Sequence, residues 1–188
     1  MFMMICVVIL CGLSLESFRL SVAAGAIQAD LTKRKIIWLG AIFAVVQFFL
    51  FFLGTILRLK GETRFFLLEK MDVAIHTDCM IFAVLGCVYI WQGIREKRME
   101  ESCVHPWSVE GFTKYALKHG LMFLIVGCAS ADCLNRAFWY CAEIFLFLLV
   151  ASVIGLAYGY WQGIKGWRKI RVVTGCLWVV TAICLLLA

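Results

Sequence analysis

The fold of this chain is decided by two short segments that resemble each other, Ser14-Leu15-Glu16-Ser17-Phe18-Arg19 and Ser130-Ala131-Asp132-Cys133-Leu134-Asn135-Arg136. Each segment places a carboxylate and an arginine inside an apolar run, and in each the acid is the second residue after a serine. An ionisable group at the centre of a membrane helix costs roughly 2.5 to 3.5 kcal/mol on insertion scales, so such groups usually mark a functional site. The two segments therefore predict a polar site shared by the two halves of a membrane protein.

The composition around these segments indicates an integral membrane protein. Of the 188 residues, 64% are apolar and 16% are charged, and Pro106 is the single proline. A membrane span needs about 20 consecutive apolar residues. Such runs predict six helices, at about 2–25, 36–57, 72–93, 115–136, 139–162 and 171–188. The first run contains Glu16 and Arg19 and lacks a basic beginning, so we interpret it as a retained helix and not as a signal peptide.

The distribution of Lys and Arg predicts the orientation, because cytoplasmic loops carry an excess of both. On one side of the predicted helices lie Lys33, Arg34, Lys35, Arg95, Lys97, Arg98, Lys114, Lys118, Lys165, Arg168, Lys169 and Arg171. The other side has Arg58, Lys60, Arg64, Lys70 and Arg136. Both termini should therefore lie outside the cytoplasm. This bias, with attraction to anionic lipid headgroups, accounts for the net charge of +6, so we expect the lipid bilayer and no nucleic acid as a partner.

With the amino terminus outside and three helices in each half, the first helix runs inward and the fourth runs outward. The expected fold is therefore all-α, with six transmembrane helices forming two inverted three-helix repeats. The repeats comprise residues 1–98 and 115–188, joined by a cytoplasmic loop at 99–114. Inverted repeats of this kind place a transport site near the bilayer midplane.

The charged pairs allow two interpretations. Glu16 and Arg19 are three residues apart and Asp132 and Arg136 are four apart, so each pair shares one helix face. Each carboxylate could simply neutralise its own arginine, which gives structural ion pairs and no transport. Alternatively, the acids coordinate a small divalent cation. Spacing alone leaves both interpretations open.

Under the second interpretation, further oxygen atoms complete the shell that divalent manganese or magnesium accepts. Gln47, the strongly polar residue inside the second predicted helix, is a neutral ligand or a hydrogen-bonding partner of another helix. The remaining candidate ligands and supporting groups are Ser14, Ser130 and Asn135.

Asp72, His76 and Asp78 open the third predicted helix on its outer side. Asp72 and His76 share a face and could form a low-affinity metal vestibule. The alternative is that these residues only hydrate a helix end at the membrane interface.

The ten cysteines do not indicate a redox site or a disulfide framework. Most lie within predicted spans and no Cys-x-x-Cys occurs, so we expect them to act as small packing residues. The sequence shows no metal-ligand helix, no nucleophile with its base and no phosphate-binding glycine loop. We therefore expect a protein that is not an enzyme and has no cofactor besides a transported cation.

At this point a family resemblance can be stated. Leu10-Cys11-Gly12-Leu13-Ser14-Leu15-Glu16-Ser17-Phe18, followed by Ser21-Val22-Ala23-Ala24-Gly25, resembles the first helix of the manganese efflux pumps of the MntP type. Those pumps carry a Ser-Met-Asp-Ala-Phe-Ala-like motif there, and a Ser-Leu-Asp-Ala-like motif in the fourth helix that corresponds to Ser130-Ala131-Asp132-Cys133. The resemblance covers nearly the whole chain at low identity. It implies two inverted three-helix repeats in the bacterial cytoplasmic membrane and export of manganese.

This chain departs from the family pattern at the site. It has Glu16 in place of an aspartate, Gln47 in place of an acid, and Arg19 and Arg136 in place of small residues. A divalent cation would thus enter a site without net negative charge unless the arginines turn away.

The sequence-based prediction is a divergent exporter of a divalent cation, in which the arginines occupy the acids when metal is absent. Coupling to protons or to the membrane potential fits a carboxylate in a low dielectric. The alternatives are a structural or regulatory membrane protein, and an exporter of an anion or amino acid bound by the arginines. The small residues Ala23, Ala24 and Gly25 would permit a homodimer contact.

Overall fold

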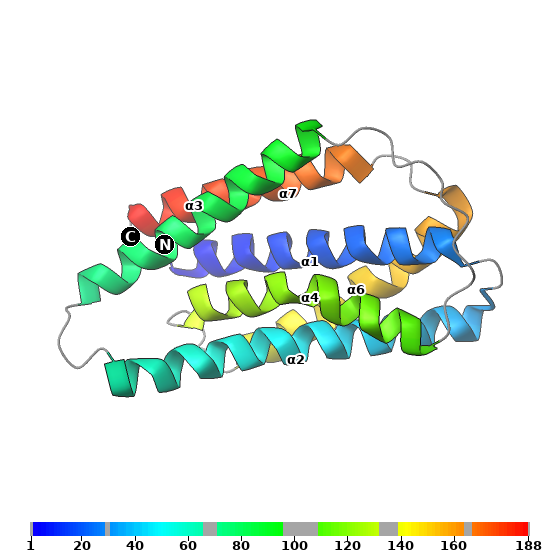
Figure 1. Ribbon diagram of the computed structural model, residues 1–188, viewed down its shortest axis with the longest axis horizontal. Coiled ribbons are helices and arrows are strands. Elements are labelled where there is room, and N and C mark those ends of the chain that lie inside the picture. Colours follow the sequence, from blue (N-terminus) through cyan, green and yellow to red (C-terminus); the bar gives the residue numbers. More distant parts are fainter. Residues whose placement is uncertain are drawn as a thin grey trace.

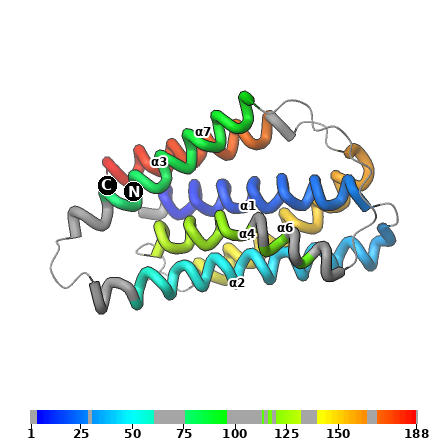
Figure 2. The backbone as a smooth tube through the Cα atoms, viewed as in Figure 1, coloured from blue at the N-terminus to red at the C-terminus, as the bar shows by residue number. Residues whose placement is uncertain are grey.

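The computed structural model describes residues 2–28, 31–65, 71–95, 109–131, 139–163 and 167–187 (Figure 2). Within these ranges the chain is entirely helical, with no strand. The helices are α1 (Phe2–Ile27), α2 (Lys33–Phe65), α3 (Met71–Arg95), α4 (Val109–Ala129), α6 (Trp139–Gln162) and α7 (Trp167–Leu186).

The fourth helix differs most from the sequence-based expectation. α4 begins at Val109, inside the segment expected to be a cytoplasmic loop, and ends at Ala129. Ser130, predicted inside this helix, is in a turn that follows it. The predicted site residues Asp132, Asn135 and Arg136 lie outside the described residues.

Five of these helices, α1, α2, α3, α6 and α7, contain segments long and apolar enough to cross a membrane. Among the described side chains of α4, Gly120–Ala129 form a further apolar stretch. Large apolar side chains point outward from the bundle, among them Trp38, Phe49, Met80, Leu121, Phe147 and Ile183. Such surfaces are rare on soluble monomers but suit contact with lipid. The helices therefore indicate a membrane protein.

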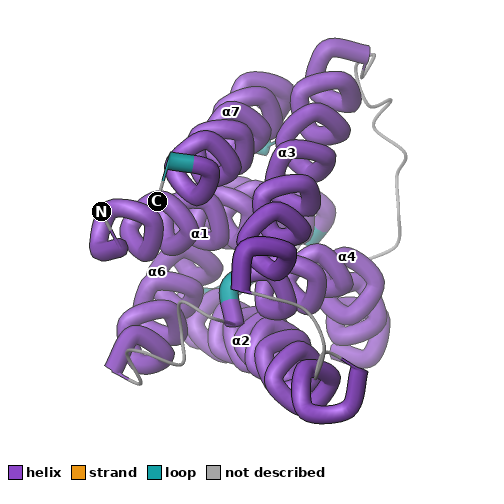
Figure 3. The backbone as a smooth tube through the Cα atoms, turned by 90° about the vertical axis from the view of Figure 1, so that its left-hand side faces the viewer, coloured by secondary structure: helices purple, strands orange, loops and turns teal. Residues whose placement is uncertain are grey.

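Helix α1 is the central element of the bundle. In Figures 1 and 3, α3 and α7 lie on one side of α1, and α2, α4 and α6 lie on the other. Two thirds (67%) of the apolar segment of α1 is buried, against 28% to 44% in the other four spanning segments. A polar side chain on α1 is therefore shielded from lipid by neighbouring helices.

Helices α1 and α6 approach closely through small residues that face backbone carbonyls. A Cβ added at Gly25 would lie 2.3 Å from the carbonyl oxygen of Leu156. Conversely, a Cβ added at Gly159 would lie 2.1 Å from the carbonyl oxygen of Val22. Glycine at both positions lets the two backbones meet, which is the usual way for membrane helices to pack.

Helices α2 and α4 repeat this arrangement. A Cβ at Gly54 would lie 2.1 Å from the Leu124 carbonyl oxygen, and one at Gly127 would lie 2.1 Å from the Phe51 carbonyl oxygen. Between helices α3 and α7 the two glycines contact each other directly: Gly86 and Gly175 each face the carbonyl oxygen of the other. Three helix pairs thus depend on reciprocal glycine contacts.

Two helix ends follow local sequence rules. Thr32 precedes α2, and its hydroxyl accepts a hydrogen bond from the Lys35 backbone N–H at 3.4 Å, as an N-cap residue does. Gly163 follows α6 with a φ of 66°, the left-handed conformation that commonly ends a helix at glycine.

Candidate functional site

Glu16 and Arg19 form a buried ion pair at the centre of the bundle. Both belong to α1, one turn apart, and their exposed fractions are 2% and 3%. The Arg19 Nε–H donates to Glu16 Oε2 at 2.8 Å, and Arg19 Nη2 donates to Oε1. Both carboxylate oxygens are therefore engaged by one guanidinium group.

The pair is expensive to bury. Removing two charges from water costs several kcal/mol per ion, which their attraction balances only when the geometry is good and hydrogen bonds complete it. The bidentate geometry meets this condition. A well-packed apolar pair is often as stable, so the geometry fits both a binding site and an ion pair that fixes the helix register.

Tyr89 of α3 completes this centre. The Arg19 Cζ atom lies 5.8 Å from the centroid of the Tyr89 ring, within the range of a cation–π contact. Tyr89 and Glu16 also line the same small cavity, so the phenol ring lies near the carboxylate. Tyr89 is buried, so the guanidinium and the carboxylate share a partner that is shielded from lipid.

A small cavity of about 10 Å³ lies beside Glu16. Glu16 and Tyr89 are among its lining residues, and the others are apolar side chains of α1, α4 and α7. A space of this size accommodates about one water molecule. The carboxylate therefore faces room for one water-sized group.

Gln47 does not join Glu16 and forms a separate polar group instead. Ser17 Oγ donates to Gln47 Oε1 at 2.6 Å, and lies 2.8 Å from Ser152 Oγ. These residues come from α1, α2 and α6, and all three are fully buried. Gln47 Nε2 has no hydrogen-bond partner.

The two predicted supporting serines bind their own helix. Ser14 Oγ donates to the Leu10 carbonyl oxygen at 2.7 Å, and Ser130 Oγ donates to the Val126 carbonyl oxygen at 2.7 Å. Hydroxyl groups in apolar helices often satisfy themselves in this way. Neither serine contributes its hydroxyl to the Glu16 centre in this structure.

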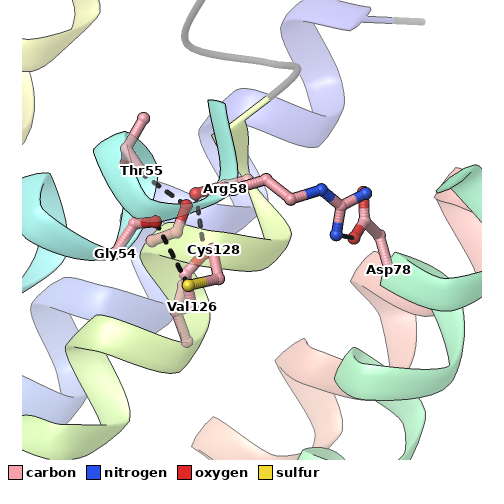
Figure 4. Close-up of polar contacts among 8 residues, drawn as sticks. Gly54, Thr55, Arg58, Asp78, Val126 and Cys128 are labelled. Atoms are coloured by element: carbon pink, nitrogen blue, oxygen red, sulfur yellow. Dashed lines mark hydrogen bonds and ion pairs between the residues drawn. The ribbon is translucent and has the colours of Figure 1, made fainter. Parts of the chain in front are cut away.

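The residues of the predicted outer vestibule differ in their surroundings. Asp78 is buried and pairs with Arg58 of α2, whose Nη1 lies 3.0 Å from Asp78 Oδ1 (Figure 4). His76 is exposed, and the side chain of Asp72 lies outside the described residues. Asp78 therefore links α2 to α3, a role that the sequence-based prediction of a hydrated helix end did not include.

Next to this ion pair, polar groups join α2 to α4. The Cys128 thiol donates to the Gly54 carbonyl oxygen at 3.1 Å, and Thr55 Oγ1 donates to the Gly127 carbonyl oxygen at 3.2 Å (Figure 4). These contacts fix the end of α4 beside Arg58.

Among the residues that the structure describes, no group of three or more His, Cys, Asp or Glu is positioned to hold a metal ion. The candidate site therefore consists of one carboxylate, its arginine and Tyr89. Sequence reasoning did not include Tyr89, Ser17 or Ser152. A serine next to Glu16 in an apolar helix was the available signal for Ser17, whereas a tyrosine near the end of a predicted span carries no such signal.

Comparisons with protein-family models, with curated proteins and with solved structures each found no match to this chain. The resemblance to manganese efflux pumps therefore stays a prediction from the motifs. The functional argument depends on the geometry of the described residues.

Proposed function

We propose that this protein is a membrane transporter for a small cation and that Glu16 is its cation-binding carboxylate. The observation that carries the proposal is the burial of an ionisable carboxylate in the central helix, beside a cavity of about one water molecule. Manganese is the first substrate to test, because of the motifs around Glu16. The expected location is the bacterial cytoplasmic membrane, with both termini outside the cytoplasm.

Arg19 acts as an internal counter-cation in this mechanism. It neutralises Glu16 while no substrate is bound, so the empty carrier has no uncompensated charge in the membrane. A cation that enters the cavity displaces the guanidinium from at least one carboxylate oxygen. The Tyr89 ring offers Arg19 a second partner, so that the displaced group remains stabilised.

Reciprocal contacts between the helix pairs support two inverted repeats. Gly25 and Gly127 are as far apart in sequence as Val22 and Leu124, whose carbonyl oxygens face the glycines of the partner helices. An approximate two-fold axis that exchanges α1 with α4 would produce this pattern. Glu16 and Asp132 are separated by more residues, so this helical repeat does not align the two acids of the sequence motifs.

The partner helices α6 and α2 also show equal sequence separations between corresponding residues. Leu156 and Phe51 are as far apart in sequence as Gly159 and Gly54. Alternating access in such repeats proceeds by one repeat rocking against the other around a midplane site. The pairing of helices therefore supports a transport function independently of the site chemistry.

A structural role is the second candidate. It is favoured by the engagement of both Glu16 oxygens, which leaves the carboxylate satisfied without a substrate. In that case the ion pair only fixes the register of α1. A third candidate, export of an anion or amino acid, would use Arg19 as the binding group.

The test is manganese flux into proteoliposomes that contain the purified protein, with zinc, cadmium and magnesium in parallel. The variants are Glu16→Gln, Asp132→Asn and the double variant, and Ser14→Ala is the control because its hydroxyl binds only its own helix in the structure. We expect flux in the wild type and in Ser14→Ala, and its loss in Glu16→Gln.

If the folded wild-type protein showed no flux of any of the four metals, this result would contradict the proposal. Loss of folding in Glu16→Gln, combined with unchanged flux in the folded fraction, would favour the structural role. Flux of an anion that manganese does not affect would favour the third candidate.

A further inference from the structure

The interface of α1, α2 and α6 contains a polar cluster that the cation site at Glu16 does not use. Its members are Ser17, Gln47 and Ser152, and each is fully buried. Glu16 and Ser17 are adjacent on α1, so their side chains leave the helix about 100° apart. The cluster therefore faces α2 and α6, whereas Glu16 faces Tyr89 of α3.

Three oxygen atoms converge in this cluster. Ser17 Oγ is 2.6 Å from Gln47 Oε1 and 2.8 Å from Ser152 Oγ. None of the three side chains carries a charge. One hydroxyl thus joins three helices through neutral oxygen atoms.

Two buried polar atoms beside the cluster have no hydrogen-bond partner, Gln47 Nε2 and Ser21 Oγ. Ser21 lies one turn after Ser17 on α1 and faces α6, where a Cβ at Gly155 would lie 2.8 Å from the Ser21 Cβ. Leaving a buried polar group without a partner is unfavourable, and most buried polar groups in proteins are hydrogen-bonded. The Ser21 oxygen therefore has lone pairs to offer a cation, whereas the Gln47 N–H group needs an acceptor such as a water molecule.

The cluster also lies where two repeats would meet. By the sequence separation that relates Phe51 to Leu156, Gln47 corresponds to Ser152, so α2 and α6 contribute equivalent positions. Substrate and coupling-ion sites in inverted-repeat transporters lie at such an interface.

The neutral hydroxyl and amide oxygens of the cluster indicate which class of ligand it would bind. Hydroxyl and amide oxygens are hard ligands, and rings of neutral oxygens can replace the hydration shell of an alkali cation. A divalent cation among neutral oxygens would leave two uncompensated charges in the membrane, which is more unfavourable than the single charge of a monovalent cation.

We propose that Ser17, Gln47 and Ser152, with Ser21 as a fourth oxygen, bind a dehydrated monovalent alkali cation. This second site goes beyond the proposed function, because it is separate from Glu16 and does not depend on which substrate Glu16 binds. In a transporter it would supply the coupling ion.

The experiment measures thermal unfolding of the purified protein in an uncharged detergent. Choline chloride is replaced stepwise by lithium, sodium or potassium chloride at constant ionic strength. We expect at least one alkali cation to raise the Tm along a saturable curve, because a ligand that binds only the folded state stabilises it by mass action. The readout requires no transport, so it is independent of the flux test at Glu16.

Ser17→Ala and Ser152→Ala are the test variants, and Ser14→Ala is the matched control on the same helix. We expect the half-saturating concentration to rise about tenfold or more in each test variant, as for the loss of one oxygen ligand in a buried site. Ser14→Ala should keep the wild-type curve. Gln47→Glu adds a carboxylate and should extend the stabilisation to a divalent cation.

A wild-type Tm that does not change with any alkali cation would overturn the proposal and would leave a cluster occupied by water. The same saturable curve in folded Ser17→Ala and Ser152→Ala would also overturn it. If one of these variants does not fold, the other decides the outcome.

Discussion

At the scale of single residues, the chemistry of the buried centre depends on the mutual neutralisation of Glu16 and Arg19. Each charge is stable in the bundle only because the other is present, and Tyr89 interacts with both. Breaking a buried pair leaves an uncompensated charge, whereas replacing both partners can be nearly neutral. The two single variants and the double variant should therefore differ strongly.

We expect Glu16→Gln and Arg19→Met each to reduce the free energy of unfolding by about 3–5 kcal/mol. The double variant should recover most of this loss. The measurement is a double-mutant cycle by denaturant unfolding in mixed micelles. Additive losses in the double variant would show that the two charges do not depend on each other.

At the scale of helices, packing depends on close contact between backbones. Gly127 of α4 faces the Phe51 carbonyl oxygen, and this contact cannot move without moving α2. Gly120, on the same helix, faces the Leu50 Cδ1 atom, the end of a flexible side chain. The two glycines provide a matched comparison between a rigid and a yielding neighbour.

Gly127→Ala should reduce the free energy of unfolding by about 1–3 kcal/mol, the usual cost of overpacking. Gly120→Ala should cost clearly less, because Leu50 can change its rotamer. Thermal unfolding of both variants tests this order. Equal losses would show that backbone contact does not control the packing of α2 against α4.

The Arg58–Asp78 ion pair joins α2 to α3 at one end of the bundle. The Arg58 side chain is 18% exposed, so solvent weakens the attraction and we expect a coupling energy of about 1 kcal/mol. A cycle with Arg58→Gln and Asp78→Asn measures it. A coupling energy of zero would show that the two side chains do not stabilise each other in the folded protein.

At the scale of the whole molecule, both termini lie at the same end of the bundle (Figure 1). Termini at the same end of a helical bundle are expected when the chain crosses the membrane an even number of times.

We therefore predict that tags at the two termini are accessible from the same side of the membrane. From the distribution of Lys and Arg, we expect this side to be outside the cytoplasm. Protease or antibody accessibility in intact cells and in inverted vesicles measures the orientation. Termini on opposite sides would show an odd number of crossings.

The sequence alone determined the helical class, because apolar runs of membrane-spanning length have few alternatives in lipid. It also determined that Glu16 and Arg19 share a helix face, since residues three apart always do. Only the tertiary structure decided which helices face each other. It separated Gln47 from Glu16 and joined it to Ser17 and Ser152.

The distinction between local spacing and tertiary contacts also explains why the sequence did not predict the ion pair of Asp78 or the bounds of α4. The sequence predicts that the second helix ends at residue 57, but α2 continues to Phe65. Arg58 lies in this additional part and pairs with Asp78. α4 ends at Ala129, so Ser130 follows the end of its helix. Ser14, its counterpart in the sequence motif, lies within α1. Local spacing fixes the neighbours of a residue on its own helix, but contacts between helices depend on where small residues let backbones meet, and these positions become clear only when the whole bundle is packed.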